Sequence, residues 1–319
     1  MTSIDNEILS TRTVKNKVGW TTPKDVTGIA KECDLVVVAM AKPEVIPLKT
    51  PVKLIRIQKV RGDGKNPGHC LKAMKKTLEI LTTLEGPIVI SIGGTDRTFP
   101  RSTDKRHKKN SKAFRQTFVK LVNHPKVAKI FGENFDLKHP KLISMPLGLN
   151  YSHSRSILDY HQLFKPRRHR TLKVSSFNRV RHGPQFLLRR RVNRYCKHAW
   201  SKKVGFAGNV SKGYLKALSR YPFTLCVTGG GIDPCPKLYD ALLVGVIPII
   251  KRNHPQTKAF KDLPVIEVSH WGPQTITKEK LKKWYALYSP YFLNPVKRFQ
   301  VLQRMTIGHW IKKMRSYCS

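Results

Sequence analysis

A cation and a carboxylate stand three residues apart at the start of one apolar segment. Lys237 and Asp240 belong to PKLYDALLVG, in which Pro236 suits the first position of an expected helix. At this spacing both side chains lie on one face of the first helical turn. Lys237 could hold a diphosphate and Asp240 a ribose diol, the two groups that a nucleotide presents. The spacing alone fits better with an exposed ion pair on an ordinary helix.

Two glycine-bearing loops follow expected strands in the same part of the chain. One loop, GNVSKG, starts at Gly208, and the other, GGG, starts at Gly229. Glycines at strand ends let a phosphate approach the backbone amides, so Gly208, Asn209 and Gly230 are candidate ligand-binding residues. Neither loop matches the phosphate loop of nucleoside triphosphatases or the dinucleotide fingerprint of dehydrogenases, which disfavours both classes.

Two arginines follow the strand expected at residues 171–175. Arg179 and Arg181 are placed to clamp a diphosphate at the carboxyl end of that strand. The alternative is that they belong to a general basic surface, which this chain also has.

Short β-branched runs alternate with amphipathic segments along the chain, and this pattern predicts parallel sheets with helical crossovers. The fold class is therefore α/β, with two Rossmann-like halves separated by the basic stretch 151–170. We expect a first domain at residues 1–165, a second at 166–294, and a helical segment at 295–319 that packs back on the first domain. The expected strands lie at residues 35–39, 53–58, 88–92, 127–132, 142–146, 171–175, 203–207, 223–227, 246–250 and 265–268.

The chain is strongly basic. Its 61 Lys and Arg residues exceed its 19 Asp and Glu residues by 61 − 19 = 42 charges. No carboxylate occurs from Tyr160 to Ile232, and the run from Arg97 to Arg115 opposes eight cations with Asp104 alone. Nucleic acid, an anionic membrane surface and a phosphorylated small molecule are all eligible partners, although no zinc-finger, KH or basic-zipper pattern accompanies the charge. A compositional bias spread over solvated faces explains the charge equally well.

Several classes of protein are disfavoured. The six cysteines contain no C-x-x-C pair, so neither a disulfide framework nor a zinc site is indicated. The longest apolar runs fall short of the ~20 residues that a transmembrane helix needs, and the N-terminus has no signal-peptide pattern. We therefore expect a protein without a transmembrane segment that is not secreted.

One segment of the chain resembles a known family. FTLCVTGGGIDPCPKLYDALLVGVIPIIKR, followed by FKDLPVIEVSHW and ITKEKL, resembles the donor-nucleotide half of exostosin-like glycosyltransferases. KVGFAGN is similar to the F-A-G-N strand and loop of that family, and FGENFDLKHPKLISMPLGLNY is similar to its hinge-proximal segment. The PKLYDAL helix also resembles, more distantly, a segment of fucosyltransferases that use a guanosine donor. The resemblance is specific from about residue 174 to residue 281 and weaker from 87 to 151.

The resemblance implies a GT-B fold, in which two Rossmann-like domains face each other across a cleft. It also implies an inverting transfer of a sugar from a nucleotide-sugar, for which UDP is the expected nucleotide, to an acceptor hydroxyl on a glycan. Lys237 stands where the family usually has Arg, and Asp240 stands where it usually has Glu. Because the chain has no Asp-x-Asp pair, we expect no essential metal and no cofactor besides the sugar-nucleotide substrate.

An inverting transfer needs a general base to take the proton from the acceptor hydroxyl. Asp96, in SIGGTDRTFP, comes just after an expected strand and is the first candidate. Asp136 is the alternative and, with Glu133, follows the next strand along the chain. The alternative to a catalytic role is that Asp96 is a turn residue that caps Thr98 or pairs with Arg97.

Two function classes remain open from the sequence. The first is a metal-independent glycosyltransferase in the cytoplasm, which would be the host cytoplasm if a virus encodes the chain. The second is a non-catalytic basic protein that binds nucleic acid or another polyanion on a degenerate GT-B scaffold, and non-specific polyanion or membrane-surface association is compatible with either.

Overall fold

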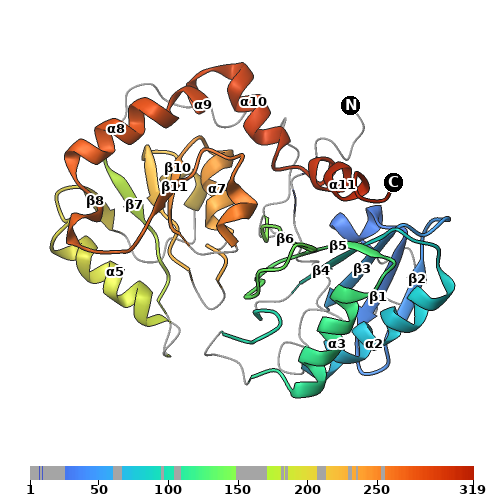
Figure 1. The fold of residues 1–319 in the computed structure, drawn as a ribbon. Coiled ribbons are helices and arrows are strands. Elements are labelled where there is room, and N and C mark those ends of the chain that lie inside the picture. Colours follow the sequence, from blue (N-terminus) through green and yellow to red (C-terminus); the bar gives the residue numbers. More distant parts are fainter. Residues whose placement is uncertain are drawn as a thin grey trace. The chain divides into compact units, whose positions relative to one another are not determined.

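The chain forms two compact units (Figure 1). A computed structural model describes residues 7, 9, 26–59, 67–94, 97–103, 109–148, 171–180, 183, 186–206, 213–228, 232–234, 236–252 and 256–319. The first unit comprises Leu9–Ser154 and Ile307–Ser319, and the second comprises Met1–Ile8 and Arg155–Thr306. The expected linker at 151–170 lies outside the described residues.

The first unit is built on a six-stranded sheet of order β2-β1-β3-β4-β5-β6. β2 pairs antiparallel with β1, and every other neighbouring pair is parallel. The strands β1, β3 and β4 are fully buried, which is why they read as continuous apolar runs in the sequence. The strand bounds are β1 (Leu35–Ala39), β2 (Glu44–Pro47), β3 (Leu54–Lys59), β4 (Ile88–Gly93), β5 (Val127–Gly132) and β6 (Leu142–Ser144).

Helices α2 (Pro67–Thr83) and α3 (Lys112–Asn123) pack together against one face of this sheet (Figure 1). Their apolar side chains, including Met74 and Phe118, form one buried cluster with side chains of β1, β3, β4 and β5. Ser111 caps α3 by accepting a hydrogen bond from the amide of Phe114.

The second unit contains a five-stranded, all-parallel sheet of order β11-β10-β9-β7-β8. The strands are β7 (Val174–Ser176), β8 (Val204–Phe206), β9 (Phe223–Leu225), β10 (Ile247–Lys251) and β11 (Ile266–Val268). The helical segments are α5 (Leu187–Lys197), α6 (Tyr214–Leu218), α7 (Lys237–Leu243), η5 (Gln256–Phe260), η6 (Pro273–Thr275), α8 (Lys278–Tyr288), α9 (Pro290–Leu293) and α10 (Pro295–Gln303).

These two parallel-dominated sheets confirm the predicted α/β class. All ten expected strands are present with ends within three residues of the prediction, and β2 is an additional edge strand. No helix in the described part of the chain is long and apolar enough to cross a membrane.

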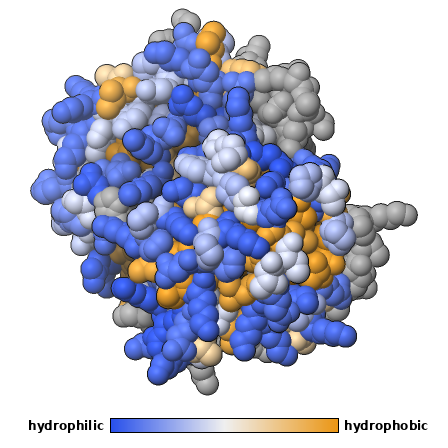
Figure 2. Space-filling model, turned by 45° about the vertical axis from the view of Figure 1, so that its right-hand side comes forward, coloured by the Kyte–Doolittle hydropathy of each residue, from blue (hydrophilic) through white to orange (hydrophobic). Residues whose placement is uncertain are grey.

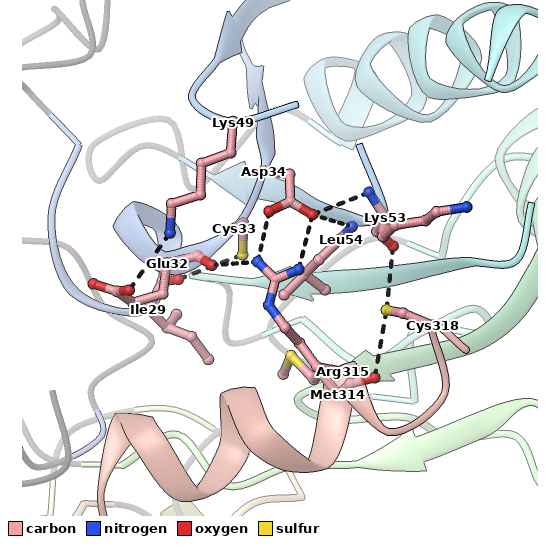
Figure 3. Close-up of polar contacts among 10 residues, drawn as sticks. All are labelled: Ile29, Glu32, Cys33, Asp34, Lys49, Lys53, Leu54, Met314, Arg315 and Cys318. Carbon is pink, nitrogen blue, oxygen red and sulfur yellow. Dashed lines mark hydrogen bonds and ion pairs between the residues drawn. The ribbon is translucent and has the colours of Figure 1, made fainter. Parts of the chain in front are cut away.

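The C-terminal segment is two helices, where the sequence predicts one helical stretch. α10 belongs to the second unit, because buried Arg298 donates a hydrogen bond from Nη2 to the carbonyl of Leu243 at the end of α7 (2.9 Å). α11 (Ile307–Arg315) belongs to the first unit and contacts the short helix η2 (Gly28–Glu32). Arg315 at its end binds the carboxylate of Asp34 (Figure 3).

Candidate functional site

The strand order of the second unit marks one edge of its sheet for ligand binding. When the strands are numbered 1 to 5 by their place in the chain, they lie side by side in the order 2-1-3-4-5. The chain therefore goes from β7 to β8 on one side of β7 and then to β9 on its other side. In open parallel sheets ligands bind at the carboxyl ends of the strands where this reversal occurs. The candidate site therefore lies at the carboxyl ends of β7 and β9. In the first sheet the described parallel strands β1, β3, β4, β5 and β6 follow one another in chain order, and the strand on the other side of β1, β2, is antiparallel.

Helix α7 packs beside this edge and is buried along its whole length. Lys237, 9% exposed, donates from Nζ to the carbonyl of Phe177 (3.0 Å) and to Oδ1 of Asn178 (2.7 Å). Asp240 is 5% exposed. The interpretation of this pair as an exposed surface feature is therefore wrong. Lys237 instead ties α7 to the loop that follows β7.

A second cation, Arg189 of α5, joins the loops that follow β7 and β9. Its guanidinium donates to the carbonyls of Val227 and Thr228 and to the carbonyl of Arg179 (2.9 Å). Its partners lie up to 39 residues away, so in the sequence Arg189 is only one of the cations between Tyr160 and Ile232. Arg189 and Lys237 together fix the backbone on both sides of the strand reversal.

Arg179 itself is exposed just beyond the end of β7. Its backbone carbonyl is held by Arg189, while its guanidinium makes no hydrogen bond or ion pair within the described part of the chain. An anion at this edge would therefore meet an exposed cation whose backbone Arg189 holds in place. The other predicted donor-site residues, Arg181, Gly208, Asn209 and Gly230, lie outside the described residues.

The loop before α7 is also anchored. The carboxylate of Asp233, 5% exposed, accepts a hydrogen bond from Nε2 of buried Gln256 in η5 (3.2 Å). This contact fixes the residues that lead into α7 against η5. Three segments border the candidate site: the loop after β7, the loop after β9 and the start of α7.

A buried polar cluster lies at the carboxyl ends of β3, β4 and β5 in the first unit. Arg56 is fully buried and donates to Oγ of Ser91 (2.6 Å). Burial lowers the pKa of Arg56, and the nearby charge of Glu133 opposes that change. Oε1 of Glu133 accepts a hydrogen bond from the amide of Gly94 (3.1 Å). A side chain at Gly93 would collide with Nη2 of Arg56 and Oε1 of Glu133 and would have to displace the ends of these two side chains.

The structure describes only one of the two candidate bases, Asp136. Asp136 accepts hydrogen bonds from the amides of Arg101 (2.9 Å) and Thr103 (3.3 Å), so its carboxylate holds the 99–103 segment. Asp96 lies outside the described residues, two residues beyond Gly94, whose positive φ of 87° turns the chain directly after β4.

No protein-family model matches the sequence, and no curated protein matches it significantly. Among solved structures, the chain is similar to TarM at 9% identity, covering 78% of this chain and 58% of TarM with a TM-score of 0.39. It is similar to the pneumococcal O-GlcNAc transferase GtfA, solved with UDP and GlcNAc, at 12% identity, covering 77% and 60% with a TM-score of 0.33. An alpha-glucosyltransferase solved with UDP and a 13-mer DNA gives 8% identity, 84% and 90% coverage and a TM-score of 0.31.

The chain spans about three fifths of the length of the first two of these proteins. At such distances the similarities assign no family, and the function is argued from the site. Among the described residues there is no group of three or more His, Cys, Asp or Glu side chains that could hold a metal ion.

Replacing Lys237 tests its anchoring role. Lys237→Met keeps the volume of the side chain but leaves the carbonyl of Phe177 and Oδ1 of Asn178 buried without this donor. Loss of charge-assisted bonds of this kind costs about 2–3 kcal/mol, so the apparent Tm of the second unit should fall by several degrees. Lys216→Met, on the exposed face of α6, is the matched control and should leave Tm almost unchanged. Equal Tm values for both variants would contradict the anchoring role.

Proposed function

We propose that the chain is a GT-B glycosyltransferase that moves a sugar from a nucleotide-sugar to an acceptor hydroxyl on a glycan. The observation that carries the proposal is the strand reversal between β7 and β9, where α7 and its PKLYDAL motif border the predicted ligand edge. The motif is the part of the sequence that resembles the donor half of exostosin-like enzymes. The topology and the resemblance are independent of each other, and both point to this edge.

In this proposal the nucleotide-sugar binds at the carboxyl ends of β7 and β9. Exposed Arg179, together with Arg181 and the loop at Gly208 and Asn209, neutralises the diphosphate as it leaves. Lys237 contributes a positive charge from its buried position and holds the β7 loop in place. Asp240 faces the ribose. Placing fixed cations where negative charge develops lowers the barrier without a metal ion.

Transfer proceeds with inversion at the anomeric carbon. Asp96 takes the proton of the acceptor hydroxyl as its oxygen forms the new glycosidic bond, and the bond to the diphosphate breaks on the opposite side. The nucleoside diphosphate then leaves with the bonding electron pair. UDP is the proposed nucleotide, on the same family resemblance.

A thermal-shift screen tests the donor site. In EDTA and about 0.3 M salt, which shortens the range of surface charge effects, the protein is mixed with UDP, GDP, CMP and their sugar conjugates. One nucleotide diphosphate should stabilise the protein selectively, by about 2.7 kcal/mol at one hundred times its Kd. The responding nucleotide-sugar is then assayed for transfer. Equal shifts with all of them, or none with any, would contradict a donor site.

The basic surface supports a second candidate function, polyanion binding without turnover. Arg190, Arg191, Arg194 and Lys197 are exposed along α5. Figure 2 shows another face of the molecule, on which hydrophilic residues surround smaller apolar areas. Binding of this kind weakens steeply as salt rises, whereas a donor pocket with few phosphate contacts weakens much less. Tight, salt-sensitive binding to DNA or RNA, with no nucleotide shift in the screen above, would favour this candidate.

A further inference from the structure

A pocket of about 650 Å³ opens in the second unit beside the edge strand β11. Its walls come from η5 and the residues after it, from the carboxyl end of β10, and from α8, α9 and the end of α10. None of the described residues assigned to the donor site lines it. η5 separates the two places, since Gln256 contacts Asp233 on the α7 side while Lys258 and Phe260 line the pocket.

Two arginines hold the walls of the pocket in place. Arg304, at the end of α10, donates from Nη1 to the carbonyl of Asp262 (2.7 Å). Arg252, after β10, pairs with Glu267 of β11 (3.2 Å). These contacts join the loop after η5 to α10 and the end of β10 to the edge strand. The cavity is therefore bounded by elements that are bonded to one another.

Two lysines of the lining remain available to a ligand. Lys258 and Lys261 are exposed, and neither ammonium has a hydrogen-bond or ion-pair partner within the described part of the chain. With the two arginines they give the lining four cations against the carboxylates of Asp262 and Glu267. One of these carboxylates, that of Glu267, is already paired with Arg252. The excess of positive charge in the lining favours an anion over a metal cation.

Two tyrosines also line the pocket, Tyr288 and Tyr291. The rings of Tyr288 and Tyr291 are 6.5 Å apart and tilted by 36°, and Tyr291 is 38% exposed. Burial, together with Tyr291 and Glu267, raises the pKa of Tyr288. Its hydroxyl is protonated at neutral pH, as that of an ordinary tyrosine is, and can donate a hydrogen bond. The ammonium of Lys297 lies over one face of the Tyr291 ring, 5.9 Å from its centroid. The rest of the exposed ring surface can pack against the flat face of a sugar or a base.

The geometry points to a second ligand site in this pocket, for which we propose a small ring compound that carries a phosphate group. Lys258 and Lys261 bind the phosphate, and the Tyr291 face packs against the ring. The volume lies within the range of about 300–1,000 Å³ that small-molecule sites occupy. A sugar phosphate and a nucleotide share this chemistry. The site goes beyond the proposed transfer, because it lies across η5 from the donor edge.

Isothermal titration calorimetry on the full chain in 0.15 M NaCl tests the site, with glucose 6-phosphate, UMP and inorganic phosphate as probes. The Lys258→Gln/Lys261→Gln variant should weaken binding of at least one ring compound by roughly tenfold or more. Lys282→Gln/Lys283→Gln removes the same charge from exposed positions of α8 outside the pocket and should leave the Kd within about twofold. Tyr291→Ala should weaken the ring compounds and leave inorganic phosphate unaffected.

The arms of the experiment separate the sources and the two sites. Tighter glucose 6-phosphate identifies a sugar phosphate, and tighter UMP that is insensitive to Arg179→Gln identifies a nucleotide at this pocket. The site is overturned if neither ring compound binds the unmodified protein, if inorganic phosphate binds as tightly as both, or if Lys258→Gln/Lys261→Gln binds normally. Because binding is read without turnover, any of these results leaves the proposed transfer reaction standing.

Discussion

Asp96→Asn is expected to lower the rate of sugar transfer by roughly two to four orders of magnitude, which is the usual contribution of a general base. Asparagine keeps the size and polarity of the side chain but cannot take the proton of the acceptor hydroxyl. The Kd for the donor nucleotide should not change, because the donor edge belongs to the second unit and Asp96 to the first. Single-turnover transfer and a nucleotide titration measure the two quantities separately.

Asp136→Asn distinguishes the two candidate bases. The carboxylate of Asp136 accepts hydrogen bonds from the amides of Arg101 and Thr103, so its replacement should lower stability and loosen the 99–103 segment. If Asp96 is the base, turnover in this variant should follow the fraction of folded protein. A large loss of turnover in Asp136→Asn, with Asp96→Asn fully active, would transfer the role to Asp136. Full activity in both would remove the base from this edge of the first sheet.

The strands could be predicted from the sequence because parallel strands buried on both faces are runs of apolar residues. β1, β4 and β10 have this form, and their predicted ends fall within one residue of the observed ones. β2 has no such signal. Glu44–Pro47 is short, half-buried and ends in proline, and it pairs only through β1 at the edge of the sheet.

The order of the strands could not be predicted, and the candidate site depends on it. An alternation of strands and helices fits both the first sheet, whose parallel strands follow one another in chain order, and the reversed order of the second. The motif around Lys237 is visible in the sequence, but its bonds to Phe177 and Asn178 join residues about 60 positions apart. Periodicity describes a helix face and carries no information about such partners. The same limit hides Arg189.

The end of the chain shows the limit at its longest range. Asp34, at the start of β1, accepts hydrogen bonds at Oδ2 from the amides of Lys53 and Leu54, and both its oxygens bind the guanidinium of Arg315 (Figure 3). Asp34 and Arg315 are 281 residues apart in the sequence. Asp34 is 2% exposed, so this buried carboxylate joins the starts of two strands to the last helix of the chain.

Asp34→Asn is expected to destabilise the first unit by about 3 kcal/mol at pH 7, because it removes one partner of a largely buried ion pair. The lower end of the usual range applies, since the side chain of Arg315 is 38% exposed. Hydrogen exchange of the α11 amides, followed by mass spectrometry, should become faster. Glu85→Gln, an exposed position in the same unit, is the matched control and should leave both exchange and unfolding unchanged.

The pH dependence of unfolding gives the sharper test of the same contact. Burial raises the pKa of Asp34, but the bonds from Arg315 and from the amides of Lys53 and Leu54 outweigh it and hold the pKa below its usual value. A carboxyl whose pKa is lower in the folded state binds fewer protons there than in the unfolded chain. Its stabilising contribution is therefore complete above the unfolded pKa of about 4 and is lost as the pH falls through the folded pKa.

Urea unfolding at pH 7 and pH 3 should show a smaller difference in the free energy of unfolding for Asp34→Asn than for the unmodified protein or Glu85→Gln. Equal differences in all three would mean that Arg315 and Asp34 contribute no net stability through their charges, and α11 would then be held by its buried apolar side chains, Ile307, Trp310 and Met314.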